Sequence, residues 1–172
     1  LHAVFEYNSN PQAEIAITEI MYHPADEMNS GQWVELYNAS SESVDVSGWK
    51  LTGNMPYKSF IIPQSTYIPA ESHIVLCTNE NAFSLNYSVS NVVGNIPFDF
   101  SNKTDIVSLY DKGGYLIDKL TYADANPWPK KADGYGYSLS FDESADDNSR
   151  SEYWHGADYY GTPGAKNSSI IT

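Results

Sequence analysis

Two glutamates lie in the middle of strand-like segments of this chain and have the residue type needed for acid–base chemistry. Paired carboxyl groups across a cleft are what glycoside hydrolysis requires, so Glu19 and Glu35 define a hydrolase hypothesis. The alternation of side chains along the second segment favours a simpler interpretation. In it, Glu35 faces solvent beside Trp33 and Tyr37, while Glu19 pairs with a lysine or accepts hydrogen bonds from backbone donors. We therefore expect no catalytic residues and keep the hydrolase as an alternative.

The other reactive residue types form no catalytic motif. The four histidines are scattered without H-x-x-x-H or H-E-x-x-H spacing, and no G-x-S-x-G nucleophile elbow is present. The single cysteine, Cys77, ends an apolar run, which predicts a buried and unreactive thiol. One cysteine also excludes an intrachain disulfide and a cysteine-based zinc cluster. The chain is therefore expected not to be an enzyme.

One acidic loop offers the oxygen ligands that calcium prefers. Its candidate ligands are Asp142, Asp146 and Asp147, although the loop lacks the alternating ligands and central glycine of an EF-hand. A solvated loop is the ordinary interpretation of such a charge run. Calcium is thus the only cofactor that the sequence leaves open, and no other is expected.

Several aromatic residues fall in the loop-like segments near the C-terminus. Trp128, Trp154, Tyr159 and Tyr160 could stack on pyranose rings, with neighbouring Asp and Asn side chains binding the sugar hydroxyls. The favoured interpretation is that they form a secondary core beneath a tail that folds back on the domain. A carbohydrate-binding module is therefore the first alternative function.

The elements that must position these residues are short β-strands. Runs rich in Val, Ile, Tyr and Thr recur between Gly, Pro, Asn and Asp, and no segment of ten or more residues has helical periodicity. Strands are predicted at residues 14–22, 33–38, 43–51, 58–62, 73–77, 105–110, 115–122 and 137–141. Short strands separated by turns in this way predict an all-β sandwich or barrel.

Structural roles are predicted for residues at turns and strand ends. Gly48 lets the chain change direction before Trp49 enters the core between two sheets. Asn38 ends a strand and can cap the following turn through its side chain. At the tip of a hairpin, Gly113 and Gly114 supply positive φ angles without a Cβ clash.

Charge and hydropathy restrict the class of partner. The 22 acidic residues against 9 lysines and arginines give a formal charge of −13, which repels both a phosphate backbone and an anionic bilayer. Nucleic-acid binding is therefore not expected. No stretch approaches the ~20 apolar residues needed to cross a membrane. The length suits one domain of ordinary size.

Three motifs occur in the order found in the lamin tail domain family, which the chain resembles. They are ITEIMYHP at residues 17–24, WVELYN at 33–38 and VDVSGWKL at 44–51, with Trp33 and Trp49 as structural residues. NKTDIVSLYDKGG at residues 102–114 continues the resemblance. The segment GTPGAKN at 161–167 is similar to the extension that bacterial members carry. The strong acidity departs from animal lamins, so their chromatin roles are not transferred.

The resemblance implies an immunoglobulin-like β-sandwich with an aromatic-rich C-terminal extension packed on it. Residues 14–167 would form a single domain that includes the extension at 126–167, between a linker or expression remnant at 1–13 and a flexible tail at 168–172. The implied function is a non-catalytic module, secreted or on a bacterial cell surface, that binds or positions a protein or a cell-envelope component. Association of edge strands into dimers or filaments is a third possibility.

Overall fold

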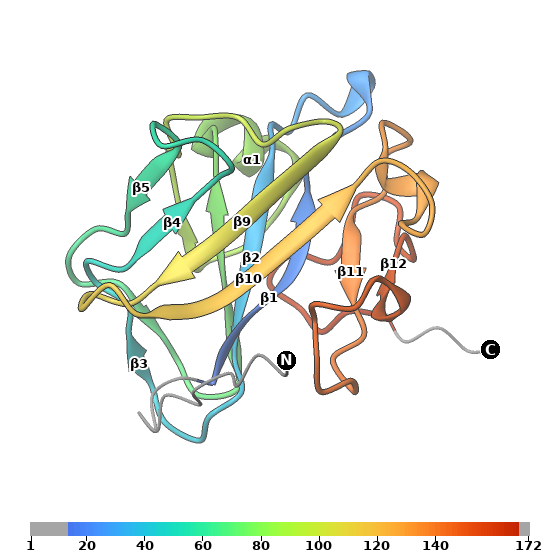
Figure 1. Ribbon diagram of the computed structural model, residues 1–172. Coiled ribbons are helices and arrows are strands. Elements are labelled where there is room, and N and C mark those ends of the chain that lie inside the picture. The colour runs from blue at the N-terminus through green and yellow to red at the C-terminus, as the bar shows by residue number, and fades with distance from the viewer. Residues whose placement is uncertain (1–13, 169–172) are drawn as a thin grey trace.

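Short strands arranged in three sheets make up most of the computed structural model, which describes residues 14–168 (Figure 1). One sheet has six strands in the order β12-β11-β1-β2-β7-β8, a second has four in the order β10-β9-β4-β5, and β3 pairs with β6. The strands are β1 (Ile15–Met21), β2 (Trp33–Asn38), β3 (Val44–Asp45), β4 (Lys50–Thr52), β5 (Ser59–Ile61), β6 (Tyr67–Ile68), β7 (Ser72–Cys77), β8 (Val92–Val93), β9 (Thr104–Tyr110), β10 (Leu116–Ala123), β11 (Leu139–Phe141) and β12 (Trp154–His155). The helical elements are α1 (Glu80–Asn86) and the 3-10 turns η1 (Asp26–Met28), η2 (Lys130–Ala132) and η3 (Ser151–Tyr153).

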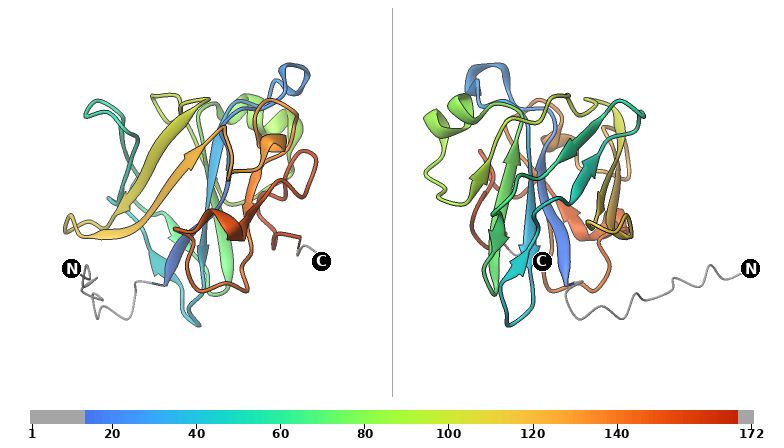
Figure 2. Two further views of the ribbon diagram at one scale, coloured as in Figure 1. Left: turned by 45° about the vertical axis from the view of Figure 1, so that its right-hand side comes forward. Right: turned by 90° about the vertical axis from the view of Figure 1, so that its left-hand side faces the viewer.

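The six-stranded and four-stranded sheets pack face to face, as the two layers in Figure 2 show. Alternate residues of each strand point between the sheets, for example Val34 and Leu36 of β2 and Val107 and Leu109 of β9. Trp49 is 6% exposed and lies in the same core. The predicted all-β sandwich is therefore confirmed, with the tryptophan after the Gly48 turn inside it.

An irregularity in β1 shifts which residues face the core. Ile17 pairs with Leu36, but Glu19 pairs with Glu35, so Thr18 is the extra residue of a β-bulge. Because of this bulge, both Ile17 and Ile20 contact the core between the sheets. Glu19 consequently points to the other side of the six-stranded sheet, which we call the outer face.

The outer face carries a second apolar cluster, beneath the helix that the sequence did not predict. Asn79 caps α1 by accepting a hydrogen bond from the Ala82 backbone N–H at 2.9 Å. Phe83 of α1 is buried edge-on against Trp33 of β2, with ring centroids 6.1 Å apart. Figure 2 shows α1 on the side of the sheet that faces away from the four-stranded sheet. A seven-residue helix is too short to show a helical period in the sequence.

The other differences from the predicted elements occur at turns. The predicted strand at 43–51 is divided into β3 and β4 by a turn at Gly48, where φ is 76°. Gly114 has a φ of 85° at the hairpin tip, but Gly113 has no positive φ, so that part of the hairpin prediction was wrong. The strands β6, β8 and β12 were missed because two residues carry no periodicity.

The C-terminal extension completes the six-stranded sheet rather than forming a separate unit. β11 pairs antiparallel with β1, and β12 pairs with β11. Residues 160–167, which we call the closing segment, then cross the outer face and contact β1 and β2 through the hydrogen bonds described below. The predicted linker at 1–13 and residues 169–172 of the predicted tail lie outside the described residues.

Within residues 14–168, no helix is both long enough and apolar enough to cross a bilayer.

Candidate functional site

Glu19 and Glu35 lie opposite each other on adjacent strands, with both side chains on the outer face. Both residues are 0% exposed. The expectation that Glu35 faces solvent was therefore wrong. The alternation along β2 was read correctly, but the face opposite the core is also covered, by the closing segment and by the cluster around Trp33.

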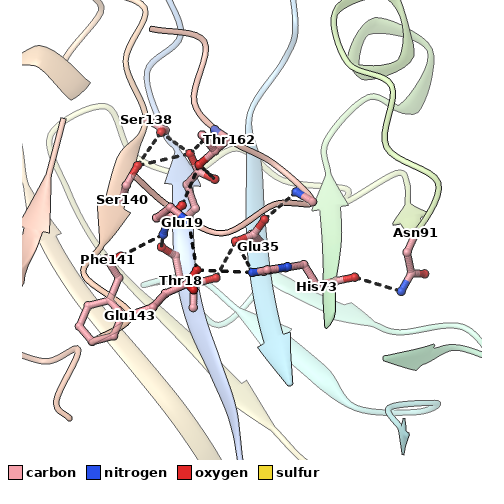
Figure 3. Close-up of polar contacts among 12 residues, drawn as sticks. Thr18, Glu19, Glu35, His73, Asn91, Ser138, Ser140, Phe141, Glu143 and Thr162 are labelled. Carbon is pink, nitrogen blue, oxygen red and sulfur yellow. Dashed lines mark hydrogen bonds and ion pairs between the residues drawn. The ribbon is translucent and has the colours of Figure 1, made fainter. Parts of the chain in front are cut away.

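Glu19 is held entirely by hydroxyl and backbone donors (Figure 3). Its Oε1 accepts hydrogen bonds from the Ser138 hydroxyl at 2.5 Å, the Ser140 hydroxyl at 3.3 Å and the Thr162 backbone N–H at 2.8 Å. The backbone donor agrees with one of the two partners expected from the sequence. The other expected partner, a lysine, does not form an ion pair with Glu19 in the described residues.

Glu35 uses its two oxygens differently. Its Oε2 accepts the Gly164 backbone N–H at 2.7 Å, and its Oε1 accepts the Thr18 hydroxyl at 2.7 Å. The same Oε1 lies 3.8 Å from Nε2 of His73 on β7, and that nitrogen lies 3.4 Å from Oε1 of Glu143 (Figure 3). One oxygen of Glu35 is therefore fixed by the closing segment, and the other faces a histidine and a second glutamate.

Burial dominates the protonation of the two paired carboxyl groups. Loss of solvation raises the pKa of Glu19 from 4.5 to about 7, against the lowering effect of its hydroxyl and backbone donors. Loss of solvation and the neighbouring charge of Glu19 raise the pKa of Glu35 from 4.5 to about 9. At neutral pH the pair therefore carries at least one proton. The hydrolase alternative needs these carboxyls in an open groove, and their complete burial does not support it.

A groove of about 870 Å³ opens on the outer face beside this carboxyl pair. Its walls come from β2, β6, β7, the segment that follows α1, and the closing segment. Its lining side chains include Tyr37, Tyr67, Glu71, His73, Glu143 and Lys166. This groove could not be predicted from local sequence patterns, because its walls are distant from one another along the chain.

The predicted calcium ligands are not assembled into a site. Asp142 Oδ1 accepts hydrogen bonds from the backbone N–H and hydroxyl of Ser144, and Asp147 Oδ1 accepts the Ser149 N–H. These donors lower the pKa of both aspartates. Across residues 14–168, the group of three His, Cys, Asp or Glu side chains close enough to share an ion is Glu35, His73 and Glu143, and it does not include Asp142, Asp146 or Asp147. The loop instead forms local turns, each closed by its own serine.

The predicted sugar-stacking residues do not form a platform. Trp154 is 1% exposed, and its indole N–H donates to the Asn148 carbonyl at 2.7 Å. Trp128 is half-buried, packed against the main core with its ring centroid 6.4 Å from that of Trp154. The rings of Tyr159 and Tyr160 are nearly perpendicular, at 77°, rather than coplanar. The two tryptophans are packed as core residues, but they belong to the main core between the sheets and not to a separate secondary core.

Two residues with predicted structural roles are placed as expected. The Asn38 amide donates to the carbonyls of Glu42, Ile68 and Pro69 at 2.8, 3.0 and 3.1 Å, which ties the end of β2 to the turns around it. The Cys77 thiol is buried beside the Val93 carbonyl, and burial raises its pKa to about 11.

Comparison with known proteins gives one family. Residues 8–124 match the family model described as Lamin Tail Domain, which is more than half of the chain. Comparison with curated proteins gave no match. The matched region ends just after β10, so β11, β12 and the closing segment lie beyond it. The Ser140 hydroxyl of β11 and the backbone donors of the closing segment, which bind Glu19 and Glu35, are therefore outside the match. The fold of this family is an immunoglobulin-like β-sandwich, and the two packed sheets of this chain have that architecture. This chain therefore belongs to the lamin tail domain family.

Proposed function

We propose that this chain is a non-catalytic module that acts outside the cytoplasm and binds or positions a cell-envelope component through the outer-face groove. The observation that carries this proposal is the composition of the groove walls. They combine strands of the family domain with the closing segment of the extension, so one rigid surface is presented by both parts. The two reactive carboxyls beside the groove are buried and fully hydrogen-bonded, which favours recognition over catalysis.

The lining of the groove supports a hydroxyl-rich ligand, such as an envelope polysaccharide. Tyr67 is 51% exposed and offers an aromatic face at the groove wall. Ser88, Ser90 and Glu71 are exposed along the same lining and can bind hydroxyl groups. If the chain binds carbohydrate, we therefore expect the binding surface to be this groove and not the C-terminal tryptophans.

The extracytoplasmic location is part of the proposal and rests on the similarity of the closing segment to bacterial secreted or surface members of the family. Labelling of intact cells with an antibody against the chain would test it. Signal from intact cells supports a surface location, and signal only after lysis contradicts it.

Binding itself is tested with a glycan array and with co-sedimentation on purified, insoluble cell-wall polysaccharide. We expect the native chain to bind at least one glycan class and Tyr67→Ala to weaken that binding by about tenfold, since one stacking contact is worth about 1–2 kcal/mol. The matched control is Tyr57→Ala, because Tyr57 is 72% exposed but lies at the turn between β4 and β5 of the other sheet. Absence of binding to every glycan, or equal loss in both variants, contradicts the proposal.

A further inference from the structure

Three carboxyl groups converge on the outer face around a single basic side chain. Glu35 and Glu143 both lie within 4 Å of His73 Nε2, and Glu19 is the cross-strand neighbour of Glu35. In the described part of the chain, no lysine or arginine forms an ion pair with Glu35 or Glu143. A buried carboxylate is stabilised by a positive partner, and a bound cation would supply one to Glu35 and Glu143.

The ligand atoms of Glu35, His73 and Glu143 have the spacing of a metal site. One atom from each residue lies within 4.8 Å of the other two. The two distances from His73 Nε2 are 3.4 Å to Glu143 and 3.8 Å to Glu35. In a tetrahedral zinc site with bonds of about 2.1 Å, ligand atoms are separated by about 3.4 Å. The two separations from His73 Nε2 are therefore within a few tenths of an ångström of the spacing in such a site.

The three side chains are held in place by groups outside the cluster. The Gly164 N–H binds Oε2 of Glu35 and leaves Oε1 directed at His73. The His73 ring packs on Tyr37 with centroids 4.6 Å apart, and the Asn167 N–H donates to Glu143 Oε1 at 3.3 Å. Such support keeps ligands oriented before an ion arrives, as it does in known metal sites.

The cluster is buried but reachable. The side chains of Glu35, His73 and Glu143 are 0%, 9% and 9% exposed. His73 and Glu143 also line the groove, which gives an ion and its water a path from solvent. Three protein ligands with one side open to water are typical of zinc sites that keep a free coordination position.

We propose that Glu35, His73 and Glu143 bind a divalent zinc ion, with water from the groove completing the coordination. An imidazole and two carboxylates suit zinc better than calcium or magnesium, which prefer all-oxygen sets with more ligands. The three ligands come from β2, from β7 and from the extension. The bound ion would therefore fasten the extension to the family domain, whatever ligand the groove accepts.

The test is isothermal titration of the chelator-treated full chain with zinc chloride, together with thermal unfolding. We expect one zinc per chain and a higher Tm, with no saturable binding of calcium or magnesium. His73→Gln and Glu143→Gln should each weaken zinc binding by tenfold or more, as loss of a ligand does. Matched controls are Glu71→Gln, a groove carboxylate outside the cluster, and His23→Gln, whose ring pairs with Asp133 elsewhere.

A readout on the native chain keeps the test independent of how the variants fold. In ¹⁵N NMR, zinc should shift the Nε2 resonance of His73 and leave those of His23 and His155 in place. Absence of saturable zinc binding, a shift at another histidine, or equal binding in the ligand and control variants overturns the proposal. Tyr67→Ala should retain zinc binding, so failure of the groove proposal is distinguishable from failure of this one.

Discussion

Glu19 and Glu35 face each other across β1 and β2, and the closing segment donates one backbone N–H to each carboxyl group. The donors are the backbone N–H groups of Thr162 and Gly164, which are two residues apart in the chain. Their acceptors, Glu19 and Glu35, lie on neighbouring strands. The extension is thus fastened to the family domain at two buried acids. Two kinds of experiment therefore probe this contact. One measures how stability depends on the protonation of the two glutamates, and the other alters the backbone of the closing segment.

The stability of the chain should fall as pH rises through the titration of Glu19. Its pKa is raised from 4.5 in the unfolded chain to about 7 in the fold, so folding takes up a proton between these values. Its contribution is fully present below about pH 4.5 and is lost as the pH passes about 7. Glu35, with a pKa of about 9, extends the loss to higher pH. Glu19→Gln should remove the part of the pH dependence that comes from Glu19, which is a change in unfolding free energy of about 1 kcal/mol per pH unit.

Urea unfolding of the metal-free protein between about pH 5 and about pH 8 measures this effect through the linkage relation. The informative quantity is the difference in unfolding free energy between the wild type and Glu19→Gln at each pH. A wild-type stability that increases over this range, or a variant with an unchanged profile, contradicts the assignment of the proton to Glu19.

Gly161→Ala should destabilise the closing segment. The residue has a φ of 72°, and a Cβ there would lie 2.6 Å from Glu19 Oε1 and 2.8 Å from the Ser138 hydroxyl. Gly114→Ala is the matched control, because its φ is 85° with no atom within 4 Å of the added Cβ. We expect a loss of ~1 kcal/mol for Gly114→Ala from the left-handed backbone alone, and ~2–3 kcal/mol more for Gly161→Ala from the contact. Urea unfolding measures both losses of unfolding free energy. Equal losses in the two variants would show that the structure around residue 161 accommodates the added Cβ without cost.

Asn38→Ala should lower the unfolding free energy by ~2–4 kcal/mol, because three carbonyls lose the same buried amide donor. Asn54→Ala provides the control, since Asn54 is exposed in the turn between β4 and β5. That change should stay within about 0.5 kcal/mol. Chemical unfolding of both variants gives the comparison, and a loss below about 1 kcal/mol for Asn38→Ala would rule out its bridging role.

Cys77 should react with a thiol reagent only when the chain opens. Its side chain is buried and its pKa is raised to about 11, so little thiolate forms at neutral pH. Labelling with dithionitrobenzoate, followed by absorbance, should be slow in buffer and fast in denaturing urea. Rapid labelling of the native protein would show that β7 and the strand beside it separate readily.

Much of the sandwich could be predicted from short stretches of sequence. The alternation in β2, the Gly48 turn before Trp49 and the hairpin between β9 and β10 each depend on neighbouring residues, and all were predicted. The helix α1 was missed because its capping residue Asn79 and its single buried face span too few residues to form a pattern. The calcium hypothesis for the acidic loop depended on residue composition alone. Acidic composition indicates possible ligands, but it does not indicate that their oxygens converge.

The sequence by itself determined the longer strands, the turn at Gly48, the sign of the charge and the family, because these follow from residue type and local spacing. Only the tertiary structure decided that Glu35 is buried, since the group that covers it, the Gly164 N–H, is 129 residues away. It likewise decided that Glu35, His73 and Glu143 meet. A strand's period of two assigns a side chain to one of two faces. Which of those faces is covered, and by what, depends on contacts between segments that share no local pattern.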